Sequence, residues 1–146
     1  MNDDEFVHRR VLRAPRELVW RCLTEPAELA RFWGPDGTTT PIDGIVVELR
    51  PGGRFETLMV GEHGGHRMVA TFTEVVPPER LAWVEPATGM HTTGTLDDLG
   101  DGTTALVIRQ RNVPETMRGP EARAGFLTSL DRLEEHLAHL APEDRS

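Results

Sequence analysis

The sequence predicts an α+β domain in which a curved antiparallel sheet of about seven strands wraps around a long C-terminal helix. Runs of strand-forming residues alternate with turn signals through the middle of the chain, which is typical of an antiparallel meander. Residues 120–140 carry apolar side chains at steps of three and four, which indicates a helix with one face to bury. The 146 residues suit one compact domain, 1–146, that can hold a core without disulfides.

The N-terminal part predicts one strand followed by two short helices. Residues 5–13 (EFVHRRVLR) have the composition of a strand. Pro15 then stands where a helix can begin, and LVWRCL after it has apolar residues at helical spacing. Pro26 takes the first position of a second helix, 26–32, which Gly34-Pro35 ends.

The middle of the chain predicts six further strands. Their turn signals are PGG at 51–53, GG at 64–65, PPE at 77–79, PATG at 86–89 and GDG at 100–102. The strands between them are 43–50, 53–62, 66–76, 80–86, 89–99 and 103–112. The final helix begins near Pro120, and its apolar stripe consists of Phe126, Leu130, Leu133, Leu137 and Leu140.

Two turns suggest a register. If Gly64-Gly65 is a two-residue hairpin loop, residue i faces residue 129 − i, so that His63 pairs with His66. A three-residue loop at PGG aligns the strand before it with the strand after it, bringing Ile45, Val47 and Leu49 beside Phe55, Thr57 and Met59. This register predicts one mostly apolar face, with Phe55, Met59, Met68 and Phe72 inward and Arg54, Glu56 and Arg67 toward solvent.

Several segments resemble the START-like, or SRPBCC, superfamily (Bet v 1-like). They are APRELVWRCLTEPAELARFWGP (14–35), LRPGGRFE (49–56), VVPPERLAW (75–83), LGDGTTALVI (99–108) and GFLTSLDRLEEHL (125–137). Within it the chain is similar to bacterial proteins related to the C-terminal domain of the activator of the Hsp90 ATPase. Phe126 departs from the tryptophan expected after the glycine. The resemblance implies a helix-grip fold with a cavity between the sheet and the long helix.

That cavity, as the resemblance implies, holds small and mostly apolar molecules. Met59 and Met68 are flexible side chains that suit an adaptable pocket, and the small residues Gly125 and Ser129 leave room on the covering helix. The same residues also suit an ordinary core. The candidate ligand-binding residues are Trp33, Phe55, Met59, His66, Met68, Phe72, Trp83, His91, Phe126 and Ser129.

The histidines of VGEHGGHRM predict no metal site. His63 and His66 supply two ligands, His91 is the one other nearby candidate, and a zinc site needs three or four protein ligands. The pair is then a polar rim at a pocket mouth or, as loop tips usually are, a solvated hairpin end. Cys22 lies on an apolar helical face and is expected to be a buried small hydrophobe rather than a nucleophile. We expect no cofactor and assign no catalytic residue.

Composition narrows the partners and the location. Acidic residues outnumber basic ones, 24 to 16, for a net charge of −8, which argues against nucleic acid. No apolar run approaches the length of a membrane span, and the N-terminus has no signal-peptide pattern. A single cysteine fits a reducing compartment. We expect a cytoplasmic monomer or homodimer.

These observations favour binding of a small hydrophobic or aromatic molecule without chemistry. One alternative is an enzyme of the polyketide cyclase, aromatase or hydrolase type, against which the absence of tyrosine argues, because tyrosine is a donor suited to apolar pockets. Another is a protein-interaction module, as in the chaperone activator. A roomy cavity would favour the first two, and a filled core with an exposed apolar patch the third.

Overall fold

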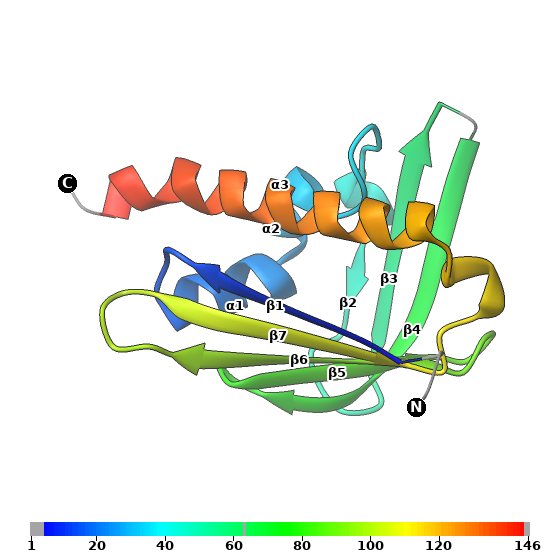
Figure 1. Ribbon diagram of the computed structural model, residues 1–146, viewed down its shortest axis with the longest axis horizontal. Helices are drawn as coiled ribbons and strands as arrows, with labels where there is room; N and C mark the ends of the chain where they lie inside the picture. The colour runs from blue at the N-terminus through cyan, green and yellow to red at the C-terminus, as the bar shows by residue number, and fades with distance from the viewer. Residues whose placement is uncertain (1–4, 63, 145–146) are drawn as a thin grey trace.

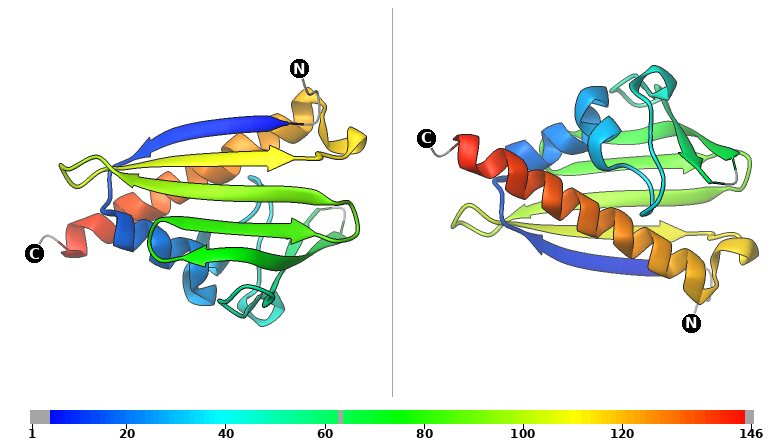
Figure 2. Two further views of the ribbon diagram at one scale, coloured as in Figure 1. Left: turned by 90° about the horizontal axis from the view of Figure 1, so that it is seen from below. Right: turned by 90° about the horizontal axis from the view of Figure 1, so that it is seen from above.

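The computed structural model describes the backbone of residues 5–62 and 64–144 and the side chains as far as residue 140. Its seven strands form one antiparallel sheet in the order β1-β7-β6-β5-β4-β3-β2. A long helix, α3 (Pro120–Asp144), crosses one face of the sheet diagonally (Figures 1 and 2). The predicted fold class is therefore confirmed.

The element boundaries follow the turn signals closely. The strands are β1 (Phe6–Leu12), β2 (Val46–Val47), β3 (Arg54–Gly61), β4 (Gly64–Val76), β5 (Arg80–Glu85), β6 (Met90–Asp98) and β7 (Thr104–Arg111). The helices before the meander are α1 (Arg16–Thr24) and α2 (Pro26–Phe32). Two short 3₁₀ turns, Ile42–Gly44 and Glu115–Met117, complete the chain.

The predicted hairpin register is wrong by four residues. Gly61 pairs with Gly64 and Met59 pairs with His66. The turn therefore lies between Gly61 and Gly64 and does not consist of Gly64-Gly65. His63 itself falls outside the described residues. Because side chains alternate with a period of two, a shift of four leaves the faces unchanged. Phe55, Met68 and Phe72 are therefore buried, and Arg54 and Arg67 are exposed, as predicted.

The strand predicted at 43–50 is also corrected. Only Val46 and Val47 pair with β3, and Val47 lies opposite Phe55, which the three-residue loop does not allow. The chain bends early because the amide of Glu48 already bonds to the carbonyl of Arg54 and the amide of Arg50 bonds to that of Glu48. Leu49 consequently leaves the sheet and is 40% exposed.

The main core lies between the sheet, α1, α2 and the C-terminal half of α3. α3 buries Leu130, Leu133 and Leu137, whose spacing puts them on one helical face. Arg10 of β1 joins this half of α3 to the sheet through Asp131 at 2.6 Å and Glu134 at 3.4 Å. Within the described part of the chain, no helix is both long and apolar enough to cross a membrane.

Candidate functional site

Four of the predicted site residues form one aromatic cluster against the concave face of the sheet, which faces α3. Phe55 stacks on Phe72 with 5.1 Å between ring centroids and meets Trp83 edge-on at 5.0 Å. Trp33, which follows α2, lies 5.4 Å from Phe55 and 6.2 Å from Trp83. These rings contact one another directly, so they fill the part of the concave face formed by β3, β4 and β5.

Hydrogen bonds hold Trp33 over this part of the sheet. Its indole N–H donates to the hydroxyl of Thr57 at 3.1 Å, and its carbonyl accepts from Thr40 at 2.6 Å. Thr57 is fully buried on β3. Trp33 therefore closes part of the region in which we expect a cavity from the sequence.

The loop after Trp33 is fixed to α3. Arg132 donates to the carbonyls of Gly34 and Pro35 at 2.8 and 3.0 Å, and the hydroxyl of Thr128 accepts from the amide of Asp36 at 3.0 Å. Gly34 has a φ of +100°, and a Cβ there would lie 2.7 Å from the Thr38 hydroxyl, so the sharp turn requires glycine.

The remaining predicted residues are divided among different places. Met68 is buried beside Thr57, and Met59 packs half-buried against the core. His66 is exposed at the start of β4, and Ser129 is half-buried on α3. His91 lies on the opposite face of the sheet from the inward Thr92, and its Nε2 is 3.2 Å from the Thr73 hydroxyl. The structure thus brings neither His66 nor His91 into the aromatic cluster.

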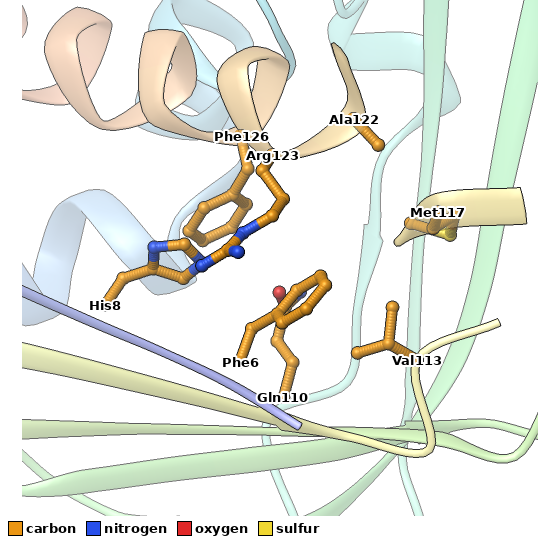
Figure 3. A pocket seen from close by; sticks show the side chains of 8 residues that line it. All are labelled: Phe6, His8, Gln110, Val113, Met117, Ala122, Arg123 and Phe126. Carbon is orange, nitrogen blue, oxygen red and sulfur yellow. The ribbon is translucent and has the colours of Figure 1, made fainter. Parts of the chain in front are cut away.

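A small pocket lies where β1 and β7 pass under the first turns of α3 (Figure 3). Its volume is about 40 Å³, which is room for two or three water molecules and too little for a ring. Of the predicted site residues only Phe126 lines it. The full lining is Phe6, His8, Gln110, Val113, Met117, Ala122, Arg123 and Phe126.

Three polar side chains surround this pocket, those of His8, Gln110 and Arg123. The His8 ring lies 4.6 Å from the Phe126 ring, and the Arg123 guanidinium stands 4.4 Å above the ring of Phe6. The Nε2 atom of His8 is buried and has no hydrogen-bond partner among the described residues. Burial, and then the charges of Arg123 and Arg10, lower the pKa of His8, so its imidazole is neutral at pH 7. The pocket therefore combines aromatic walls with a neutral imidazole, an amide and one cation.

The pocket and the aromatic cluster lie on the same face of the sheet. Cross-strand pairing aligns Phe72, Trp83, Thr92, Gln110 and Phe6 in one inward row over five strands. The row begins in the filled cluster and ends in the pocket, so both belong to one concave surface.

The packing of α3 explains why space remains at one end. None of the side chains of residues 120–129 is fully buried, whereas the buried leucines of the helix all come after them. Gly125 is not part of the cavity roof, because a Cβ there would meet Pro35 at 3.6 Å. Gly125 is thus not among the residues that line this pocket, whereas Ala122 of the same helix is.

One carboxyl group belongs to the same surface. Glu85 pairs with Met90 at the end of β5 and shares the inward face with Trp83, two residues earlier. Burial raises the pKa of Glu85. In the described part of the chain this side chain has no ion pair, so it is a polar group available to the concave face.

Two other features are less suited to an apolar ligand. A groove of about 260 Å³ between α1 and the sheet is lined partly by charged residues, including Arg16, Glu79, Arg80 and Asp97. Cys22 is fully buried, and burial followed by the charge of Glu28 raises its pKa to about 12. Cys22 is therefore a buried small side chain, as the sequence predicted, and its raised pKa disfavours the thiolate, which is the reactive form.

Sequence reasoning missed most of the pocket lining. Phe6 and His8 share a face with Leu12 because side chains alternate along a strand, but the apolar Val7 and Val11 lie on the opposite face, so the sequence does not show which face is buried. Gln110 follows once β1 is paired with β7. Val113 and Met117 lie in the connection before α3, where no periodicity indicates a direction.

The sequence and the fold match a known family. The sequence profile described as "Activator of Hsp90 ATPase homolog 1-like protein" matches residues 13–138. A solved protein of Nitrosomonas europaea is 27% identical, with a TM-score of 0.80 over 94% of this chain and 96% of that one. An AHSA1-like protein of Aeromonas hydrophila is 25% identical, with a TM-score of 0.80 over 94% of each chain.

A third structure, from Chromobacterium violaceum, is 27% identical, with a TM-score of 0.80 over 91% of this chain and 96% of its own. A search of curated proteins found no match. The profile spans most of the chain, and the resemblance seen in its turn and helix-boundary motifs is thereby confirmed. The chain belongs to the family of activator of Hsp90 ATPase homolog 1-like proteins.

Proposed function

We propose that this protein binds a small apolar molecule containing a ring, without transforming it, between the concave face and the N-terminal half of α3. The observation that supports this most directly is the pocket at Phe6, His8 and Phe126, where the covering helix is loosely packed. Small-molecule sites are mostly apolar, with a few polar groups that fix orientation. The superfamily that the sequence resembles holds such molecules between the same two elements.

A ring requires the pocket to widen. Met117 is 41% exposed in the connection before α3, and its flexible side chain can move with little loss of packing. Phe126 is half-buried and can turn away from His8. Both side chains line the pocket, so their displacement enlarges it toward the row formed by Gln110, Thr92 and Trp83.

Polar groups then orient the ligand. The Nε2 of His8, the amide of Gln110 and the guanidinium of Arg123 lie on the pocket wall, and Glu85 lies farther along the same face. A ligand with one hydrogen-bonding group on its ring pairs with the buried Nε2, which has no partner among the described residues.

A thermal-shift screen of ring compounds, including polyketide-like and steroid-like molecules, tests the proposal. A compound at about 100 times its dissociation constant adds about 2.7 kcal/mol to the folded state. Ala122→Leu fills the pocket and should abolish the shift. Ala124→Leu is the matched control, because Ala124 is exposed on the same helix and does not line the pocket.

Two results contradict this proposal. One is a screen in which no compound raises the melting temperature, and this result favours the protein-interaction module. The other is a shift that persists unchanged in Ala122→Leu, which places the compound elsewhere. We further propose that the protein acts in the cytoplasm, which the free thiol of Cys22 supports, and that it is a monomer or homodimer.

A further inference from the structure

Three side chains with metal-binding chemistry meet where α1, α2 and α3 adjoin. Cys22 comes from α1, Glu28 from α2 and His136 from α3. The thiol sulfur, one carboxylate oxygen and one imidazole nitrogen all lie within 4.8 Å of one another. In Figure 2 the two short helices lie beside the C-terminal half of α3, far from its N-terminal turns. The cluster is therefore separate from the ligand pocket.

The three donors are held by packed helices. Cys22 is completely buried, and the Nε2 of His136 is 2.7 Å from the Oε1 of Glu28. The His136 ring stacks on Phe32 with 6.1 Å between centroids and 23° between planes, which fixes its orientation. The side chains of His136 and Glu28 are 13% and 18% exposed, so the cluster opens to solvent on that side.

The spacing suits a tetrahedral ion. Zinc bonds of about 2.3 Å to sulfur and about 2.0–2.2 Å to nitrogen and oxygen separate the ligand atoms by about 3.4–3.6 Å. Since the three donors already lie within 4.8 Å, shifts of about 1 Å or less complete the geometry. One sulfur, one nitrogen and one carboxylate oxygen make the set that favours zinc over magnesium or calcium.

Arg21 is the charged neighbour that must be accommodated. Its Nε lies 3.6 Å from Oε2 of Glu28, on the side of the carboxylate away from His136. Its side chain is 42% exposed, so its charge is partly solvated. A thiolate and a carboxylate together neutralise a dication, and Arg21 then remains beside the outer oxygen as a partner that orients the ligand.

We propose that Cys22, Glu28 and His136 form a site for a thiophilic divalent cation of the zinc type, with water as the fourth ligand. The sulfur–metal bond forms as the Cys22 thiol releases its proton to solvent. The cation also replaces the hydrogen bond between the Nε2 of His136 and the Oε1 of Glu28, and the proton of that bond moves to the Nδ1 of His136 or, if Nδ1 already carries one, to solvent. No oxidation or reduction takes place. Because the ligands come from three helices, the ion joins α1, α2 and the C-terminal half of α3.

Titration of the chelator-treated full chain with Co²⁺, Cd²⁺ and Zn²⁺ tests this. We expect one ion per chain, sulfur-to-metal charge-transfer absorption with Co²⁺ and Cd²⁺, and a higher melting temperature with Zn²⁺. Cys22→Ser should remove the absorption band. His136→Gln and Glu28→Gln should each weaken binding at least tenfold, whereas His139→Gln, which changes an exposed histidine of the same helix, should leave it unchanged.

Circular dichroism of each variant shows whether it is folded. If Cys22→Ser unfolds, His136→Gln and Glu28→Gln test the site in its place. The proposal is overturned if the wild-type protein gives no charge-transfer band. It is equally overturned if folded His136→Gln and Glu28→Gln bind the ion as tightly as His139→Gln does, because the metal then sits at other residues.

Discussion

The hydrogen bond from Trp33 to Thr57 can be tested by replacing Thr57 with valine. Thr57 is 0% exposed, and the bond is 3.1 Å long. Valine keeps the shape and the strand preference of threonine and removes only the accepting oxygen. The substitution therefore isolates the bond that fixes Trp33 over the aromatic cluster.

The expected loss of unfolding free energy is about 1–1.5 kcal/mol. A buried donor left without an acceptor costs about 1–3 kcal/mol. The value falls in the lower part of this range because Trp33 is only half-buried, so its N–H can recover part of its hydration. In a chain of this size the loss lowers the melting temperature by about 3–6 °C.

Urea unfolding followed by circular dichroism measures the effect, and Trp33→Phe supplies the control. That variant keeps an aromatic ring and removes the N–H, so Thr57→Val should cost almost nothing in its background. The reasoning is refuted if Thr57→Val loses less than about 0.5 kcal/mol, below the range of a lost buried bond. The same loss in both backgrounds also refutes it.

Three further predictions concern ionisable side chains. Burial raises the pKa of Glu85, so the folded state loses stability as the pH rises above 4.5. Glu85→Gln should therefore raise the urea midpoint at pH 7 but not below pH 4. Glu121→Gln, which changes an exposed carboxylate, should leave the midpoint unchanged at both pH values. Burial lowers the pKa of His8, so the folded state loses stability as the pH drops below 6.5. His8→Leu should reduce the loss of stability between pH 7.5 and pH 5. His139→Leu, which changes an exposed histidine, should not reduce it. The pKa of Cys22 is about 12, so in metal-free protein at pH 8 iodoacetamide should alkylate it only after unfolding; fast labelling of folded protein, seen by mass spectrometry, would contradict its burial.

The sequence predicted the elements well because their boundaries depend on local chemistry. Pro26 begins α2, and the helix ends at Phe32, just before Gly34 turns the chain at a φ of +100°. The predicted register of β3 and β4 was wrong because Gly64-Gly65 is a strong turn signal. In the structure Gly61 pairs with Gly64, so the turn comes before Gly64-Gly65 in the chain. The faces were nevertheless correct, because the shift of four is even.

The site was harder to predict because it depends on tertiary contacts. Nothing local indicates that Trp33 turns back over Thr57, since that position requires Arg132 of α3 to hold the intervening loop. Likewise, Phe6 reaches Gln110 only when the first strand pairs with the last strand of the meander. Loops and long-range pairings lie beyond a periodicity argument, which treats each segment alone.

The proposed ligand needs an opening in this concave face, and the contacts at its two ends differ in how much they resist one. Displacing Trp33 breaks its bond to Thr57, separates three aromatic contacts and strains the loop that Arg132 holds. Opening the other end separates Phe126 from His8 and the Arg123 guanidinium from Phe6, and such a cation–π contact is worth about 0.5–1 kcal/mol at an exposed site. The C-terminal half of α3 remains anchored by its buried leucines and by Arg10. If the proposed ligand binds, we therefore expect the first turns of α3 to lift while the rest of the fold stays in place, with the entrance at the edge formed by β1 and β7.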